Sequence, residues 1–245
     1  MRAAERPTLR DAWDAALAGD PVSAFGGVVA LTRSVDRATA EALGAIFLEV
    51  VVAPAFDADA FTILAAKPNL RLVLDPDLAR DEPGSSPDPL CSIRSAGGAV
   101  LVTAPDTTAD DSTTWTVATR RAPTEAELLD LDLAWRLVRG VTSNAIVLVR
   151  DRRLIGMGSG QTSRVNAARG AVAQALAHAG QATLAGAACA SDAFFPFADA
   201  VEVCMAAGVG AFIQPGGSVR DAETVAAVEA GGGTMLVTGI RHFRH

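Results

Sequence analysis

The stretch SNAIVLVRDRRLIGMGSGQTSR, residues 143–164, decides the fold class of this 245-residue chain. It holds two continuous apolar runs, at 145–149 and 154–157, which predict buried strands. A glycine-spaced loop follows the second run and leads into an alanine-rich helix predicted over 164–179. Strands that are apolar throughout, rather than at alternate positions, indicate a sheet covered by helices on both faces. We therefore predict an α/β protein.

The same alternation of helices and strands occupies the N-terminal third of the chain. The predicted helices cover 8–18, 36–46 and 57–67, and the predicted strands cover 28–31, 50–52 and 70–74. Thr8, Asp36 and Asp57 stand where these helices begin, and their side-chain oxygens can accept a backbone N–H there. We expect a first α/β lobe over residues 1–75.

A loop-rich segment separates this lobe from the rest of the chain. Residues 75–92, DPDLARDEPGSSPDPLCS, contain four prolines, which predict a linker or a long surface loop. Two strands follow, near 99–103 and 114–119, and we interpret them as an appended hairpin. Residues 76–123 are therefore predicted to form a linker and a small hairpin.

A second α/β lobe is predicted over residues 124–245. Thr124 and Glu127 have the spacing of a capping box at the start of a helix that runs to about Arg139. Beyond the opening stretch, strands are predicted at 187–190, 211–213 and 234–238, and helices at 199–207 and 221–230.

Composition narrows the class of function. The net charge is −7 and no block is rich in lysine or arginine, which argues against a nucleic-acid partner or an anionic membrane surface. Three widely spaced cysteines without a C-x-x-C pair indicate reduced thiols. The charged start argues against a signal peptide, and no run of roughly 18 apolar residues could span a membrane. We expect a soluble, cytoplasmic protein.

Two glycine-containing segments have both a structural and a functional interpretation. Gly26 and Gly27 precede an apolar strand, and a tight turn is favoured there over a close approach to a ligand. The loop at 156–163 could offer backbone N–H groups to an anion, with Arg164 in the first turn of the helix. It matches neither a P-loop nor the dinucleotide fingerprint, so anion binding and a simple turn remain equal alternatives.

Two further segments gather aromatic and charged residues. Residues 190–199, ASDAFFPFAD, place three phenylalanines within four positions, between Asp192 and Asp199. An aromatic wall for a flat heterocycle and a packed loop with Asp199 as a helix cap are both open. The terminal RHFRH, residues 241–245, is either a solvated tail or a docked group for phosphate binding and proton transfer, and the solvated tail is favoured.

Seven collinear segments are more specific together than any one alone. They are DPVSAFGG at 20–27, EVVVAP at 49–54, SNAIVL at 143–148, GMGSGQTSRV at 156–165, ASDAFFPF at 190–197, IQPGGSVRD at 213–221 and RHFRH at 241–245. In order and spacing they resemble the AICAR transformylase family along essentially the whole chain. The resemblance implies two cytidine-deaminase-like three-layer lobes, the first truncated at its N-terminus. The sequence has no H-x-E…P-C-x-x-C zinc signature, so the resemblance does not extend to deaminase chemistry.

The family's reaction moves a formyl group from 10-formyltetrahydrofolate to the 5-amino group of aminoimidazole carboxamide ribonucleotide. This amine is conjugated with the ring and the carboxamide, so it is a poor nucleophile. An enzyme must remove its proton, hold it against the formyl carbon and stabilise an oxyanion.

The resemblance also implies roles for individual residues. Asn144 matches an asparagine at the reacting carboxamide or formyl group, Asp199 a carboxylate on the folate side, and His245 a terminal histidine near the site. The implied substrate-binding residues are Gly26 and Gly27 beside the nucleotide, Glu49 at the ribose, Arg164 and Arg241 at the nucleotide (Arg241 at its phosphate), and Phe194 and Phe197 along the base and folate pockets. For Asp192, beside Ser143, the resemblance implies a structural potassium ion.

One departure from the family pattern limits these expectations. The family carries a Lys-His-x-Asn-Pro-Cys-Gly segment, whose lysine and histidine transfer the proton, and a cyclohydrolase domain, and this sequence contains neither. We expect a truncated gene product, and hold a split enzyme and an inactive paralogue as alternatives. Family active sites form at dimer interfaces, so a homodimer or a second chain is the expected partner. A non-catalytic nucleotide-binding subunit and a formyltransferase for a related carboxamide nucleotide are the alternative functions.

Overall fold

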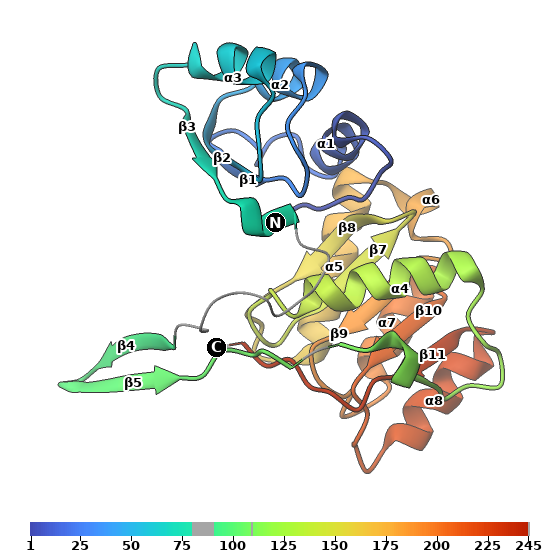
Figure 1. Ribbon diagram of the computed structural model, residues 1–245. Helices are drawn as coiled ribbons and strands as arrows, with labels where there is room; N and C mark the ends of the chain where they lie inside the picture. The colour runs from blue at the N-terminus through green and yellow to red at the C-terminus, as the bar shows by residue number, and fades with distance from the viewer. Residues whose placement is uncertain (80–90, 109, 245) are drawn as a thin grey trace. The chain divides into compact units, whose positions relative to one another are not determined.

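The computed structural model describes residues 1–79, 91–108 and 110–244, and it divides into two compact units. The large unit comprises Met1–Phe25 and Asp111–His245, and the small unit comprises Gly26–Asp110. Helices alternate with parallel and antiparallel strands in these units (Figure 1), which confirms the predicted α/β class.

The large unit is built on a six-stranded sheet with the strand order β6-β11-β10-β9-β7-β8. Its strands are β6 (Thr116–Val117), β7 (Ile146–Arg150), β8 (Arg153–Gly158), β9 (Ala188–Ser191), β10 (Ala211–Gln214) and β11 (Thr234–Val237). Its helices are α1 (Leu9–Ala18), α4 (Glu125–Val138), α5 (Arg164–His178), α6 (Gln181–Leu184), α7 (Asp199–Ala206) and α8 (Asp221–Ala230), with a 3₁₀ turn η2 (Ser112–Thr114). β9, β10 and β11 run parallel, whereas β7 is antiparallel to both β9 and β8.

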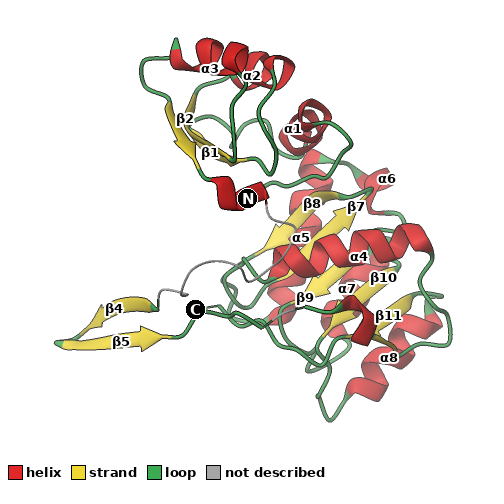
Figure 2. Cartoon of the chain, in the orientation of Figure 1, coloured by secondary structure: helices red, strands yellow, loops and turns green. Residues whose placement is uncertain are grey.

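Helices cover both faces of this sheet (Figures 1 and 2). On one face α4 buries Leu131 and Trp135 against strand residues such as Val147. On the other face α5, α7 and α8 enclose a second cluster that includes Phe195 and Phe212. Every residue of β9 and β10 is buried, so these strands do not alternate between buried apolar and exposed polar residues. The large unit is thus a three-layer structure, as its sequence predicts.

Two glycines of the quoted stretch are required by helix packing. A Cβ on Gly158 would lie 2.0 Å from the carbonyl oxygen of Ala167, and one on Gly156 would lie 2.1 Å from that of Ala171. Any larger residue would therefore push α5 away from β8. These two positions are explained by the close contact of a helix with a strand, and not by anion binding.

Residues 1–25 belong to the large unit, which differs from the predicted boundary at residue 75. Ala4 forms a β-bridge with Arg153, and the Glu5 N–H donates to the Arg152 carbonyl at 3.0 Å. The Glu5 carboxylate pairs with Arg136 on α4 and with Arg152. These contacts join positions far apart in sequence, which a local pattern does not reveal.

The small unit contains a parallel three-stranded sheet of order β1-β2-β3. Its elements are β1 (Gly27–Ala30), α2 (Arg37–Leu43), β2 (Leu48–Ala53), α3 (Ala58–Ala65), β3 (Arg71–Leu74) and a 3₁₀ turn η1 (Pro76–Ala79). Figure 1 shows α2 and α3 along one side of this sheet, where Val51 and Leu64 are fully buried. Val28 and Val73 are 69% and 43% exposed, so within the described residues helices cover only one face.

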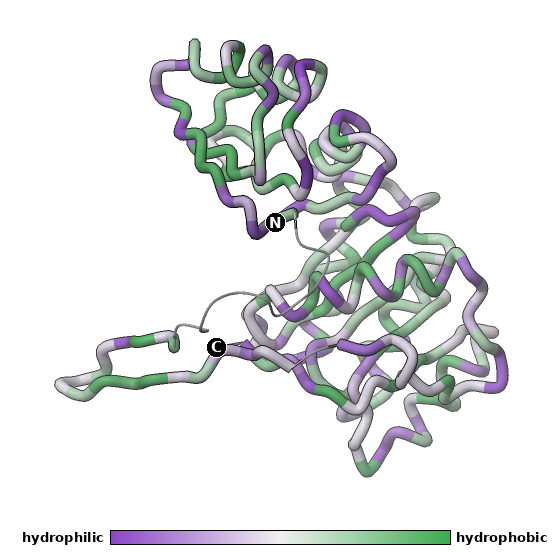
Figure 3. Tube along the Cα trace, viewed as in Figure 1, coloured by the Kyte–Doolittle hydropathy of each residue, from purple (hydrophilic) through white to green (hydrophobic). Residues whose placement is uncertain are grey.

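A separate hairpin pairs β4 (Ser92–Ala96) with β5 (Ala99–Thr103) through Gly97 and Gly98. Both glycines have positive φ, as the tight turn of a two-residue hairpin requires. Every residue of both strands is exposed, and the tube in Figure 3 is green where the hairpin residues are hydrophobic. The predicted pairing of 99–103 with 114–119 is wrong, because β6 lies in the latter range and pairs with β11. Most of the predicted linker, at 80–90, lies outside the described residues.

Local helix signals are mostly confirmed. Thr8 and Asp36 accept backbone N–H groups from Asp11 and Thr39, and Thr124 forms the expected capping box. Asp57 occupies the N-cap position of α3 but accepts no such bond. Among the described helices, none is both long enough and apolar enough to cross a membrane.

Candidate functional site

The predicted site segments of the large unit meet at one edge of its sheet. β9, β10 and β11 are parallel, so their carboxyl ends lie together. β8 runs in the same direction as these strands, whereas β7 runs the opposite way and therefore begins at this edge. Residues 143–145, 159–164, 191–199, 214–220 and 238–244 consequently converge there.

Arg164 is the centre of a buried polar network at this edge. Only 7% of the residue is exposed, and Nη1 donates to an Asp192 carboxylate oxygen at 2.5 Å and to Ser191 Oγ at 2.7 Å. Nη2 donates to Asn144 Oδ1 at 3.0 Å. Asp192 is fully buried, so Arg164 supplies the opposite charge that its carboxylate needs away from water. The pair also explains why an arginine stands in the first turn of α5.

Asn144 is held on both sides of its amide. Its Oδ1 accepts from Arg164, and its Nδ2 donates to the Gln161 carbonyl at 2.9 Å. An amide nitrogen carries two N–H groups, so the second can donate to a ligand oxygen. A fixed N–H donor of this kind can stabilise negative charge that develops on a reacting oxygen.

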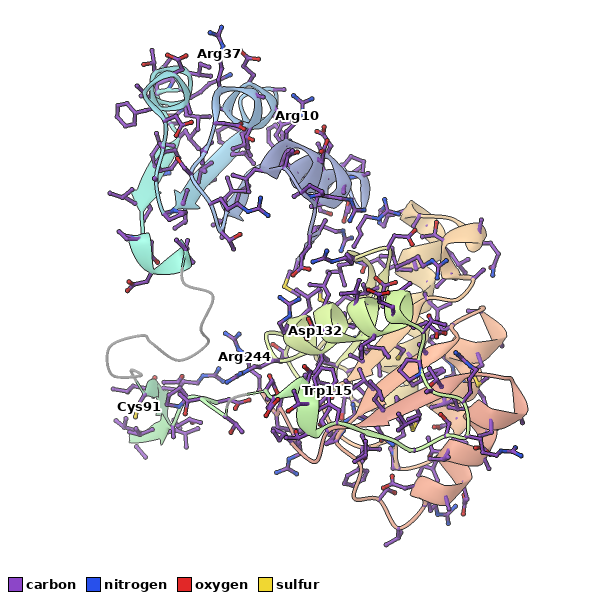
Figure 4. The ribbon with its side chains drawn as sticks, turned by 45° about the vertical axis from the view of Figure 1, so that its right-hand side comes forward. Arg10, Arg37, Cys91, Trp115, Asp132 and Arg244 are labelled. Carbon is purple, nitrogen blue, oxygen red and sulfur yellow. The ribbon has the colours of Figure 1, made fainter. Side chains whose placement is uncertain are left out.

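The C-terminal tail docks onto the same network. The ring of His242 is buried against Trp135 with the centroids 5.0 Å apart, and its backbone N–H donates to the Asp192 carbonyl at 3.1 Å. The Arg244 N–H donates to Ser143 Oγ at 3.2 Å, and the Ser143 N–H donates to the Arg244 carbonyl at 2.9 Å. Figure 4 labels Arg244, the last described residue. The favoured prediction of a solvated tail is therefore wrong for residues 242–244.

Arg241 and His245 have different outcomes. Arg241 is exposed, and its guanidinium lies 5.2 Å from the centroid of the Phe243 ring. His245 lies outside the described residues, so its predicted role stays a prediction.

Residues 190–199, the phenylalanine segment, expose two phenylalanine rings to solvent and bury the third. Phe195 is fully buried and its N–H donates to Gln214 Oε1 at 2.9 Å, which anchors the segment to β10. Phe194 and Phe197 are 36% and 51% exposed. The Arg220 guanidinium lies 5.0 Å from the Phe197 ring centroid. The two exposed rings can therefore line a surface that accepts a flat ligand.

Asp199 is the first residue of α7, and Ala198 occupies the N-cap. Its carboxylate accepts the N–H of Ala200 at 2.7 Å, so the predicted cap at Asp199 is displaced by one residue. The Asp199 side chain is exposed on the phenylalanine segment.

Three predicted substrate contacts lie in the small unit. Gly26 has a φ of +72° and donates its N–H to the Phe47 carbonyl, which supports the turn interpretation. Gly27 begins β1. Glu49 is exposed on β2 and pairs with Arg71 at 3.2 Å.

The expected potassium ligand, Asp192, is already engaged. One carboxylate oxygen accepts from Arg164 and the other from Ser143 Oγ. Arg164 supplies a positive charge beside this carboxylate. Within the described residues, no group of three or more histidine, cysteine, aspartate or glutamate side chains is arranged to hold a metal ion. The predicted potassium ion at Asp192 stays a prediction.

Sequence reasoning missed several residues of the network. Ser143 and Gln161 lie within quoted segments, but their contacts cross between loops. His242 was considered only as part of the tail. Asp20 is 6% exposed and accepts from Arg2 at 2.8 Å and from the Ser23 N–H at 3.0 Å. The Ser23 N–H, helped by Arg2, holds the pKa of Asp20 below its ordinary value despite burial. The sequence signal for Asp20 was its position as the first residue of the motif DPVSAFGG.

A buried polar network at the carboxyl ends of the strands, bordered by exposed aromatic rings and arginines, is typical of α/β proteins that bind a small ligand there. Comparison with known families identifies the class of protein. The model of the AICARFT/IMPCHase bienzyme family matches residues 2–174. The chain belongs to this family.

Full-length relatives extend the match across 97% of the chain. It is similar to the bifunctional purine biosynthesis protein PurH of Anaeromyxobacter sp. (strain Fw109-5), with 49% identity over 242 residues. The corresponding proteins of Streptococcus equi subsp. zooepidemicus (strain H70) and Limosilactobacillus reuteri (strain DSM 20016) are each 45% identical, over 237 and 238 residues. The chain spans 44–45% of the length of these relatives.

Proposed function

We propose that this chain forms the part of a formyltransferase site that binds the formyl acceptor, aminoimidazole carboxamide ribonucleotide. The observation that carries the proposal is the convergence of Asn144, Arg164 and the docked tail at the strand-end edge. Membership of the AICARFT/IMPCHase family supplies the reaction. The formyl donor in this proposal is 10-formyltetrahydrofolate.

Each side chain of the large unit has a chemical task in this proposal. The exposed guanidinium of Arg241 binds the phosphate of the nucleotide. Phe194 and Phe197 hold the flat rings of the substrates, and Asp199 stands beside them at the start of α7. The second N–H of Asn144 donates to the oxygen that becomes negative as the amine attacks the formyl carbon. Arg164 orients Asn144 from its buried position.

The remaining expectations form part of the same proposal. The three layers of the large unit support a cytidine-deaminase-like lobe there. The roles of Gly26, Gly27 and Glu49 at the nucleotide and the role of His245 near the active site are proposed from the family resemblance. A cytoplasmic location and a homodimer, or a second chain carrying the Lys-His segment, agree with the family's reaction. A structural potassium ion beside Asp192 is kept as part of the same proposal.

Turnover and binding should be measured on the same preparation. The chain is mixed with both substrates, and tetrahydrofolate release is followed by absorbance. Nucleotide binding is measured in parallel by calorimetry. Release that depends on both substrates supports the proposal. Binding without release supports the alternative of a non-catalytic nucleotide-binding subunit, and absence of both overturns the proposal.

Two variants test the assigned roles in a preparation that turns over. Asn144→Ala should lower kcat by about 10²-fold through loss of an oxyanion donor. Arg241→Ala should weaken nucleotide binding by about tenfold or more, with a smaller effect on kcat. Arg10→Ala is the matched control, since Arg10 is exposed on α1 and pairs with Asp14. Equal effects of Arg241→Ala and Arg10→Ala would remove Arg241 from the site.

A further inference from the structure

Asp192 contacts three segments of the site at once. One carboxylate oxygen accepts from Arg164 Nη1 and the other accepts from Ser143 Oγ. Its backbone carbonyl accepts the N–H of His242 at 3.1 Å. The residue is fully buried directly after β9, so these contacts are made away from solvent.

The first carboxylate contact determines how Asn144 is presented. Arg164 has a planar guanidinium with a fixed fork of donors, so the position of Nη1 fixes that of Nη2. Nη1 is held by Asp192, and Nη2 donates to Asn144 Oδ1 at 3.0 Å. The Asn144 amide is thereby oriented with its nitrogen toward Gln161. Asp192 thus acts on Asn144 through one intervening side chain.

The second carboxylate contact leads to the C-terminal tail. Ser143 Oγ donates to Asp192 and accepts the Arg244 N–H at 3.2 Å. A hydroxyl has a single hydrogen, so its donation to Asp192 leaves the oxygen lone pairs facing Arg244. Together with His242, this contact fixes the tail on both sides of Phe243.

We propose that Asp192 is a positioning residue that couples the orientation of Asn144 to the docking of the C-terminal tail. This inference rests on the proposed function for its catalytic consequence. Its structural consequence stands by itself. Asp192 touches no reacting atom in this proposal, and it acts through Arg164 on one side and Ser143 on the other.

Amide hydrogen exchange of the full 245-residue chain, measured by NMR, tests the structural consequence. In Asp192→Asn, a neutral amide replaces the carboxylate, and the Arg244 and His242 amides should exchange at least tenfold faster than in the wild type. The amides of β10 and β11 should change less than threefold. Unchanged exchange at Arg244 in a folded Asp192→Asn variant would overturn the inference.

A milder pair of variants keeps the test decisive if Asp192→Asn does not fold. Ser143→Ala removes only the branch toward the tail, so the Arg244 amide should again exchange at least tenfold faster. Ser159→Ala is the matched control, because the Ser159 hydroxyl is on a partly exposed residue, contacts the Thr142 carbonyl at 3.4 Å and lies outside the network. Equal exchange in the two serine variants contradicts the inference.

Steady-state kinetics separate positioning from general stability. Asp192→Asn should lower kcat at least tenfold and also raise KM for the nucleotide, because both branches are lost. Ser143→Ala should mainly raise KM, by about threefold to tenfold. A loss of kcat alone, in proportion to unfolded protein, points to a merely structural role and overturns the coupling. If the wild-type chain releases no tetrahydrofolate, the proposed function fails and hydrogen exchange alone decides this inference.

Discussion

The two sheets differ in what covers them, although both contain parallel strands rich in valine, alanine and leucine. In the large unit, Val147 and Ile213 pack against α4 on one face of a sheet that is covered again on its other face. In the small unit, Val51 is fully buried under helices, whereas Val28 on the opposite face is 69% exposed. Strand composition therefore does not reveal how many faces of a sheet are covered. The number of covered faces depends on which helices pack against the sheet.

The largest expected effect tests how tightly the large unit is packed. Gly158→Ala places a methyl group 2.0 Å from the Ala167 carbonyl oxygen, so α5 must move away from β8. We expect a loss of about 3 kcal/mol in the free energy of unfolding, measured by urea denaturation. Gly140→Ala is the control, since its nearest atom lies at 3.5 Å. A Gly158→Ala variant as stable as this control would mean that α5 is loosely packed.

The second prediction concerns acid stability of the large unit. Arg121 binds Glu127 through two nitrogens at 2.8 Å each, and this pairing lowers the carboxyl pKa from 4.5 to about 2. A depressed pKa stabilises the fold above pH 4.5, and this stabilisation is lost as the pH falls toward 2. We expect Glu127→Gln to lose about 2 kcal/mol at pH 7, after screening by solvent.

Urea denaturation of both proteins at several pH values measures this difference. The wild type and Glu127→Gln should become equally stable as the pH approaches 2. A constant difference over the whole range would show that the carboxyl charge is not the cause.

The third prediction addresses the covered face of the small unit. Asp36 caps α2 by accepting the Thr39 N–H at 2.7 Å, so Asp36→Ala should cost about 1 kcal/mol. Hydrogen exchange at the β2 amides reports this loss within the small unit. Asp57→Ala is the comparison, because Asp57 accepts no capping N–H. A larger effect at Asp57 would contradict the assignment of Asp36 as the stronger cap.

The smallest expected effect tests the exposed face of the small unit. Val28→Thr should change stability by less than about 0.5 kcal/mol, since the side chain is mostly in water already. Val147→Thr makes the same change at a fully buried position and should cost at least about 1 kcal/mol. Thermal unfolding measures both. A substantial cost at Val28 would show that another surface covers this face in solution.

Local signals in the sequence were the most reliable guides to the fold. Thr8, Asp36 and the Thr124–Glu127 box mark helix starts because their contacts span three residues. Strand partners depend on distant segments, so 114–119 was paired with the wrong strand. Gly156 and Gly158 resemble a ligand loop in sequence, and only the return of α5 shows what they accommodate.

The sequence predicted which residues belong to the candidate site better than it predicted the contacts between them. The motifs identified Asn144, Arg164 and Asp192. They could not show that Arg164 binds Asp192, 28 positions away, instead of facing solvent. His242 looked equivalent to its neighbours in RHFRH, and only its burial against Trp135 distinguishes it. Contacts that cross between loops require the three-dimensional arrangement.

The discontinuous large unit has a consequence for synthesis on the ribosome. Glu5 pairs with Arg152, which lies 147 positions later, and the whole small unit is translated between them. At 5–20 residues per second, the first segment waits on the order of ten seconds for its partner. The buried face of α1, with Trp13, therefore lacks its contacts with β8 until that strand has been synthesised. The small unit can therefore complete its three strands before the two segments of the large unit come together.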